Sequence, residues 1–176
     1  MRAALLPAGP DPFLLTDWFR HFARWQSEVD VLHVLVCGLD DPEAQAYLVA
    51  EAARLRNATL HFRETRLDHG RALRQLVTEY GTDAVMLCED DAYVRRPGAV
   101  AEAFARVERG DVDIVGSPRG SVSDEVAQAA QARFGGPVSV ASGEMGNSLW
   151  PCFLFAKRDT LMLADDFGAH AYRAGE

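Results

Sequence analysis

The sequence predicts an α/β fold built on a doubly wound, mostly parallel sheet. Short apolar segments alternate along the 176 residues with segments whose apolar side chains recur at helical spacing. Strands joined by such crossover helices form parallel sheets with helices on both faces. Residues 84–88 contain no charged residue, which is typical of a strand buried on both faces. The length and a hydrophobic content of 48% predict one domain over residues 1–176.

Six apolar segments are predicted to be strands. They are Ala3–Leu6, Val31–Cys37, Thr59–Arg63, Asp83–Cys88, Val112–Val115 and Leu149–Phe155. We expect a tight loop at residues 7–10, and a structural, hydrogen-bonded role for His33 inside the second strand. Pro151 has no backbone N–H to donate, so the last strand is expected to lie at an edge or to contain a bulge.

The segments between these strands are predicted to be helices. Asp11-Pro12 and Asp41-Pro42 each combine a capping aspartate with a proline at the first helical position. The first of these helices carries a Trp/Phe stripe that favours a core position over a ligand platform. The second is expected to run to about Asn57. Further helices are expected at Gly70–Tyr80, Pro97–Arg109, Ser123–Phe134 and from Lys157 onward, with an irregular loop at Gly135–Asn147.

Composition excludes several function classes. A net charge of −8 argues against a general binder of nucleic acid, although a metal can still bring a nucleotide to an acidic site. No apolar segment approaches the length of a membrane span, and the apolar run at the amino terminus is too short for a signal peptide. The three cysteines are far apart inside apolar segments, so we expect buried thiols and a cytoplasmic location.

Three consecutive carboxylates, Glu89-Asp90-Asp91, follow the buried strand directly. In an open α/β sheet, ligands bind at the carboxyl ends of the strands. Adjacent carboxylates repel one another unless a cation or hydrogen-bond donors compensate them, and hard oxygen ligands suit Mn²⁺ or Mg²⁺ shared with phosphates. The segment therefore predicts a metal and phosphate site, with a solvated acidic turn as the alternative.

Two further segments are candidates for ligand contact. Asp40 follows the second strand, and its carboxylate is suited to accept from a nucleobase or a ribose hydroxyl, whereas Asp41 is explained as a helix cap. Gly70 allows a ligand to approach the start of the next helix, where Arg71 would donate to phosphate. The alternative for this segment is that Asp68 caps the helix and Arg71 faces water.

Together these pieces resemble the nucleotide-sugar-dependent glycosyltransferases of the GT-A fold, of the family-2 type. The resemblance rests on Asp40 and Asp41, on the His69-x-Arg71-Ala72-Leu73 helix start, and on Glu89-Asp90-Asp91 as the E-D-D form of the D-x-D motif. Residues 153–158 are similar to the late strand and basic segment of those enzymes. The resemblance to these glycosyltransferases implies a Rossmann-like domain, a nucleoside-diphosphate sugar donor and a hydroxyl acceptor.

The resemblance also implies roles for individual residues. Asp91 would be the Mn²⁺ or Mg²⁺ ligand, Asp90 would contact the ribose or the metal shell, and Glu89 the donor sugar. An inverting hexosyltransferase needs a base, for which the candidates are Glu144, Asp165 and Asp166. Asp166 lies nearest to the family's position for it. His170 is a candidate late metal ligand, with solvent exposure as the alternative.

The chain departs from the family in two places. The first strand ends in Leu6-Pro7-Ala8-Gly9-Pro10, without the usual polar residue, and the carboxy-terminal acceptor side is expected to be short or truncated. Two other functions therefore stay open. A sugar nucleotidyltransferase would normally carry a basic, Gly-rich loop after the first strand, which residues 8–10 lack, and a non-catalytic nucleotide-sugar-binding module would need no base.

Overall fold

The sheet is built outward from β1 (Arg2–Ala8), which pairs in parallel with β2 (Val31–Cys37) on one side and with β4 (Ala84–Cys88) on the other. The computed structural model describes residues 1–118 and 149–163. β3 (Ala58–Arg63) continues the parallel part beyond β2. On the other side, β6 (Leu149–Lys157) is antiparallel to β4, and β5 (Ile114–Pro118) is antiparallel to β6. The order β3-β2-β1-β4-β6-β5 confirms the mostly parallel α/β sheet.

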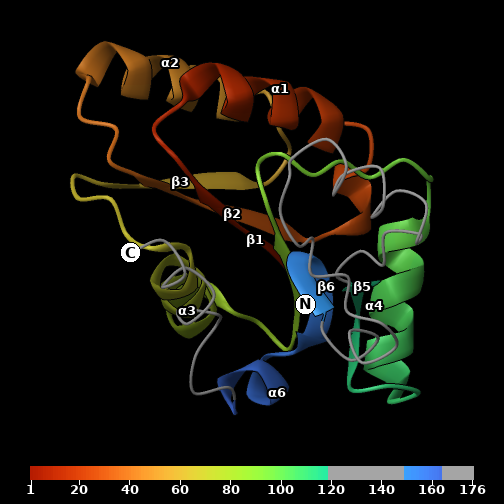
Figure 1. Cartoon of the computed structure of the whole chain (residues 1–176). Helices are drawn as coiled ribbons and strands as arrows, with labels where there is room; N and C mark the ends of the chain where they lie inside the picture. Colours follow the sequence, from red (N-terminus) through yellow and green to blue (C-terminus); the bar gives the residue numbers. More distant parts are fainter. Residues whose placement is uncertain (119–148, 164–176) are drawn as a thin grey trace, which may run out of the picture.

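Helices cover both faces of this sheet (Figure 1). α1 (Pro12–Phe22), α2 (Pro42–Ala52) and α4 (Ala99–Arg109) share one hydrophobic cluster on the first face. α3 (His69–Tyr80) and α6 (Arg158–Met162) share a second cluster on the opposite face. A short 3-10 helix, η1 (Gln26–Glu28), joins α1 to β2. The predicted doubly wound arrangement is therefore confirmed.

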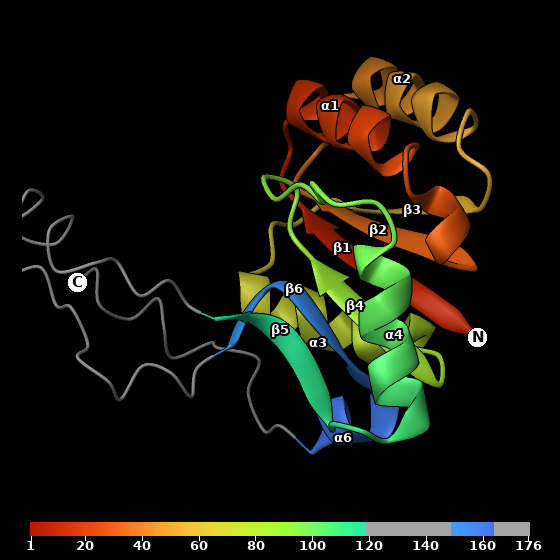
Figure 2. The same cartoon turned by 90° about the vertical axis from the view of Figure 1, so that its right-hand side faces the viewer.

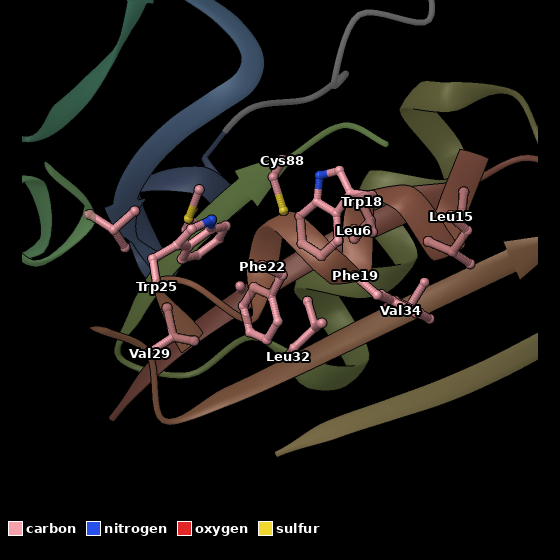
Figure 3. Close-up of a cluster of buried hydrophobic side chains, with 14 of the residues drawn as sticks. Leu6, Leu15, Trp18, Phe19, Phe22, Trp25, Val29, Leu32, Val34 and Cys88 are labelled. Atoms are coloured by element: carbon pink, nitrogen blue, oxygen red, sulfur yellow. The ribbon is translucent and has the colours of Figure 1, made fainter. Parts of the chain in front are cut away.

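The aromatic stripe of α1 is core, as its spacing predicts. The rings of Trp18 and Phe22 stack with centroids 5.4 Å apart, and Trp25 meets Phe22 edge-on at 4.7 Å. Figure 3 shows these rings lying over Leu6 of β1 and Leu32 of β2. Because each large apolar side chain contributes about 1.5–3 kcal/mol when fully buried, this cluster holds α1 firmly on the sheet.

The order of the strands places a topological switch point between β1 and β4. The crossovers through α1 and α2 lead to β2 and β3 over one face, whereas the crossover through α3 leads to β4 over the other. At such a point the loops leaving two neighbouring strands diverge, and ligands bind in the crevice between them. The residues after Ala8 and after Cys88 therefore mark the place for a site.

Several element boundaries differ from those expected. β1 extends through Pro7 and Ala8, which pair alongside Leu35 and Val36, so the loop expected there is shorter. α2 ends at Ala52, earlier than Asn57, because the following turn is bonded to residues before β2. The Arg56 N–H donates to Gln26 Oε1 at 2.7 Å, and Asn57 Nδ2 donates to the Asp30 carbonyl at 2.7 Å.

On the other half of the sheet, β5 begins at Ile114 rather than at Val112. α4 begins at Ala99 rather than at Pro97. Gly98, with φ +77°, precedes α4, and the Glu28 carboxylate accepts from the N–H groups of Gly98 and Ala101, both at 2.9 Å. The register of β5 and β6 jumps across residues 151–153, which confirms a bulge around Pro151. The helix expected at Ser123–Phe134 and the loop at Gly135–Asn147 lie outside the described residues.

Two of the three cysteines match the expectation of buried thiols. Cys37 and Cys88 are buried free thiols, and Cys88 Sγ donates to the Leu5 carbonyl at 3.4 Å. Over residues 1–118 and 149–163, no helix combines the length and apolar character needed to cross a bilayer.

His33 lies in a ring cluster that joins β2, β3 and α3. Its Nδ1 is 3.1 Å from Nε2 of His61, and the Tyr80 ring stacks on both imidazoles with centroids 4.8 and 3.9 Å away. Burial lowers the pKa of His33 and of His61, and for His33 the nearby His61 lowers it further. The expected hydrogen-bonded, structural role of His33 is confirmed.

This cluster predicts a fall in stability in mild acid. Because both pKa values are lower in the folded protein than in the unfolded chain, the unfolded chain binds more protons as the pH falls through about 6.5. A His33→Phe/His61→Phe variant keeps the stacking but cannot be protonated. Between pH 7.5 and 5.5, we expect the wild-type melting temperature to drop by a few degrees more than that of the variant.

The matched control is His21→Phe, because the His21 ring also contacts a tyrosine: its centroid is 4.3 Å from that of Tyr93, with the two ring planes tilted. It should follow the wild-type pH dependence. An equal drop for the wild type and the double variant would contradict the assignment.

Candidate functional site

The three carboxylates Glu89-Asp90-Asp91 follow β4 at the switch point. Their side chains differ in exposure, because Glu89 and Asp90 are partly buried whereas Asp91 is exposed. The cluster is therefore divided into two carboxylates held by the protein and one that faces solvent.

Asp90 connects the ends of β4 and β1. The Gly9 N–H, just beyond β1, donates to Asp90 Oδ2 at 3.3 Å. Burial raises the pKa of Asp90, and the charges of Asp91 and Glu89 raise it further, whereas the hydrogen bond from Gly9 opposes this shift. The backbone of the plain first loop thus supplies a donor that the side chains of residues 7–10 lack.

His69, the first residue of α3, lies against Glu89. Its Nε2 is 3.1 Å from Glu89 Oε1, and only 26% of the His69 side chain and 17% of the Glu89 side chain are exposed. The two atoms are close enough for an ion pair but not aligned for a hydrogen bond, so the buried Nε2 has no hydrogen-bond partner among the described residues. A buried donor or acceptor in this state is costly unless a ligand satisfies it.

The sequence had placed His69 in a motif without giving it a role of its own. The available signal was its position between the capping residue Asp68 and Gly70, at a helix start that leads toward β4. Asp68 Oδ1 accepts from the Arg71 N–H at 2.9 Å, which confirms it as the cap.

Arg71 points elsewhere than the expected phosphate contact. Its Nε pairs with Asp68 Oδ2 at 3.1 Å, and 77% of its side chain is exposed. This is the alternative arrangement, in which Asp68 caps the helix and Arg71 faces solvent. The imidazole of His69, not the guanidinium of Arg71, is what α3 brings to the acidic cluster.

Asp40 lies beyond the end of β2 with an exposed side chain. The chain turns there at Gly38, whose φ of +78° favours glycine, and a Cβ on it would lie 3.4 Å from Cβ of Arg66. Asp41 Oδ1 accepts from the Glu43 N–H at 2.9 Å and so caps α2 as expected.

A hollow of about 150 Å³ lies where the ends of β1, β2 and β4 meet the start of α3. Its lining includes Ala8, Gly9, Cys37, Arg66, His69 and Asp90. Asp40 and Arg71 are not part of this lining. The structure therefore brings Asp90 and His69 to one small cavity and leaves the other two predicted contacts outside it.

The segment that follows Asp91 is fixed to α1. Trp18 Nε1 donates to the Ala92 carbonyl at 3.1 Å, and the Tyr93 hydroxyl donates to Asp17 Oδ2 at 3.2 Å. Figure 2 shows this segment, between β4 and α4, passing beside α1. The position of Asp91 thus depends on the aromatic core beneath it.

The candidate bases Glu144, Asp165 and Asp166, and the candidate late ligand His170, lie outside the described residues. Within residues 1–118 and 149–163, no three His, Cys, Asp or Glu side chains are grouped to hold a metal ion. Mg²⁺ and similar cations commonly use one or two carboxylates together with substrate phosphates and water. The exposed carboxylate of Asp91, beside the half-buried Glu89 and Asp90, fits such a shared site.

Comparison with known proteins rests on structure alone, because no protein-family model and no curated sequence matches the chain. A mycobacterial protein of known structure is similar over 90% of this chain and 53% of its own, with a TM-score of 0.59 at 21% identity. Glucosyl-3-phosphoglycerate synthase from Mycobacterium tuberculosis, in complex with Mn²⁺, UDP-glucose and phosphoglyceric acid, has a TM-score of 0.59 at 20% identity. The match covers 90% of this chain and 57% of the synthase.

The chain has the GT-A fold. The mannosyltransferase PcManGT from Pyrobaculum calidifontis, in complex with GDP-mannose and Mn²⁺, is also similar, with a TM-score of 0.52 at 18% identity. That match covers 67% of this chain and 36% of the mannosyltransferase. The chain thus spans between about a third and just over half of these GT-A proteins. In this GT-A fold, the acidic cluster lies at the carboxyl end of the strand that the family-2 resemblance indicated.

The partly buried charge of Asp90 predicts a stability change on its removal. The raised pKa means that the folded state favours the protonated carboxyl, so this group stabilises the fold at low pH and loses that contribution as the pH rises. Asp90→Asn keeps an oxygen that accepts from Gly9 but carries no charge. At pH 7 its melting temperature should exceed that of the wild type by roughly 1–4 °C.

The difference should shrink as the pH is lowered toward 4, where the wild-type carboxyl takes up its proton. Asp113→Asn, at an exposed position, serves as the control and should not reproduce this trend. A variant that is less stable than the wild type at pH 7 would rule out this account.

Proposed function

We propose that the protein is a metal-dependent glycosyltransferase that transfers a sugar from a nucleoside-diphosphate donor to a hydroxyl acceptor. The observation that carries the proposal is the cluster of Glu89, Asp90 and Asp91 at the switch point of a GT-A fold, with His69 against it. Structurally similar GT-A proteins in complex with Mn²⁺ and UDP-glucose or GDP-mannose support it.

The donor would lie across the ends of β1 and β4. The hollow beside Gly9 would receive the nucleoside, because Asp90 offers a polar group in its lining. His69 offers a second one, since its Nε2 has no hydrogen-bond partner among the described residues. Asp91 would hold the cation, Mn²⁺ or Mg²⁺, together with the diphosphate. When bound, the cation would supply Lewis-acid neutralisation of the charge that develops on the leaving diphosphate.

The protein residues would do the positioning. Glu89 lies against His69 and would face the donor sugar, while Asp90 would contact the ribose. The hydrogen bond from Gly9 and the partial burial of Asp90 hold this carboxylate in place before the donor arrives. Asp40, exposed beyond β2, would reach the nucleotide only from the rim.

We propose inverting transfer of a hexosyl group, with Asp166 as the base and Glu144 as the second candidate. A cytoplasmic location fits the two buried free thiols. The two other functions have weaker support. A nucleotidyltransferase would use the N–H groups of the first loop for a triphosphate, but the Gly9 N–H already donates to Asp90. A non-catalytic binding module would bind the donor without ever hydrolysing or transferring it.

The first functional test is Asp91→Ala. Calorimetric titration with UDP and with GDP, with and without Mn²⁺, should reveal a metal-dependent affinity in the wild type. This affinity should fall at least about tenfold in the variant, since a ligand of the cation is lost. The melting temperature should stay the same or rise slightly, because removing one of three like charges relieves repulsion.

Asp113→Ala, a substitution of another exposed aspartate, is the matched control and should bind as the wild type does. Unchanged metal-dependent binding by Asp91→Ala would overturn the metal assignment. Unfolding of the variant would instead assign Asp91 a structural role.

The second test concerns the base. Asp166→Asn preserves size and removes basicity, so turnover should fall by roughly 10²–10⁴ while the affinity for the donor hardly changes. Glu144→Gln, measured under the same conditions, should lower turnover less than Asp166→Asn does. Retention of configuration in the product, or full turnover by both variants, would refute the proposed base.

A further inference from the structure

A second and larger hollow, of about 370 Å³, lies on the α1 face of the sheet between α4, the strands β5 and β6, and the segment after Asp91. It is distinct from the small hollow at Gly9, and no lining residue is common to both. Figure 2 shows α4 running alongside β5 and β6 at this place. A cavity of this size suits a small organic molecule.

The floor of this hollow is apolar. It is formed by Val100 of α4, by Val115 of β5, and by Phe153 and Phe155 of β6. Val100 and Phe155 belong to the hydrophobic core, and Phe155 meets Phe104 edge-on with ring centroids 5.1 Å apart. The floor therefore has a rigid backing and would bury an apolar group of a ligand.

The rim of the hollow is basic. Arg95 and Arg96 both line it. Arg96 Nη2 pairs with Glu102 Oε2 at 2.6 Å, whereas Arg95 is exposed and forms no ion pair with any other residue that the structure describes. An unpaired guanidinium beside an apolar floor is complementary to a carboxylate or phosphate attached to an apolar body.

The helix end beside this rim does not compete for such an anion. Glu28 already accepts from the N–H groups of Gly98 and Ala101 at the start of α4. Among the residues that the structure describes, Arg95 is therefore the basic group of the hollow that has no ion pair, and the charge selectivity of the hollow should depend on it.

The hollow is also close to the acidic cluster. Tyr93, which lines it, follows Asp91 by two residues, so their backbones are separated by at most about 7 Å. The bonds of Ala92 to Trp18 and of Tyr93 to Asp17 fix the segment between them. The hollow and the acidic cluster are therefore neighbours along one fixed segment of the chain.

We propose that this hollow binds the acceptor, and that the acceptor is a hydroxyl compound with an apolar body and a carboxylate or phosphate that Arg95 recognises. The acceptor role rests on the proposed glycosyl transfer. Binding of the apolar anion does not, because it uses residues outside the acidic cluster.

The test uses phenyl phosphate as the probe, with phenol and inorganic phosphate as its two halves, in the absence of metal and nucleotide. Phenyl phosphate should bind more tightly than either half. Arg95→Ala should weaken its binding by about 10- to 100-fold, as expected for loss of a hydrogen bond to a charged group. Ala99→Trp, at a partly exposed lining position, should block binding by filling the hollow.

Arg54→Ala is the matched control, because Arg54 is an exposed arginine paired with Glu51 at the end of α2, away from the hollow. It should bind phenyl phosphate as the wild type does. Equal affinity for phenyl phosphate and phenol, or unchanged binding by Arg95→Ala, would overturn the proposal. Either result would leave the metal-dependent nucleotide binding of the proposed function untouched, which separates the two failures.

Discussion

The adjacency of β1 and β4 is the constraint on which the rest of this structure depends. Every residue of β4 is buried, and β1 is buried from Ala3 to Ala8, so neither strand can move without opening the core on both faces. Their parallel pairing brings the residues after Ala8 and after Cys88 to one edge of the sheet. The acidic cluster after β4 therefore lies next to the loop after β1, where the Gly9 N–H donates to Asp90.

The site shows how a fold tolerates like charges at close quarters. One carboxylate is compensated by a backbone donor, one lies against an imidazole, and one is left in water. This division costs less free energy than burying three carboxylates. It still raises the pKa of Asp90 and leaves Nε2 of His69 without a hydrogen-bond partner among the described residues. Such residual costs are common at sites that gain their full set of interactions when a ligand binds.

Local signals in the sequence predicted much of the fold. Asp11 and Asp41 cap helices as their Asp-Pro pairs indicate, and the apolar segment before Glu89 is the buried strand. Contacts between distant segments were beyond such signals. Glu28 caps a helix 70 residues later, and the contact of His69 with Glu89 joins two elements that only the sheet order brings together. The side-chain direction of Arg71 was equally undetermined by the sequence, because the capping residue Asp68, three positions earlier, also pairs with it.

The late arrival of β6 in the chain has a consequence for how the protein is made. β6 inserts between β4 and β5, so one edge of the fully buried strand β4 remains open until residues 153–157 have been synthesised. An open apolar edge is a template for pairing with other chains. At ordinary rates of translation, the interval between β4 and β6 lasts several seconds, which is long compared with hairpin formation. Nascent chains that stall before β6 should therefore depend on chaperones more than completed ones.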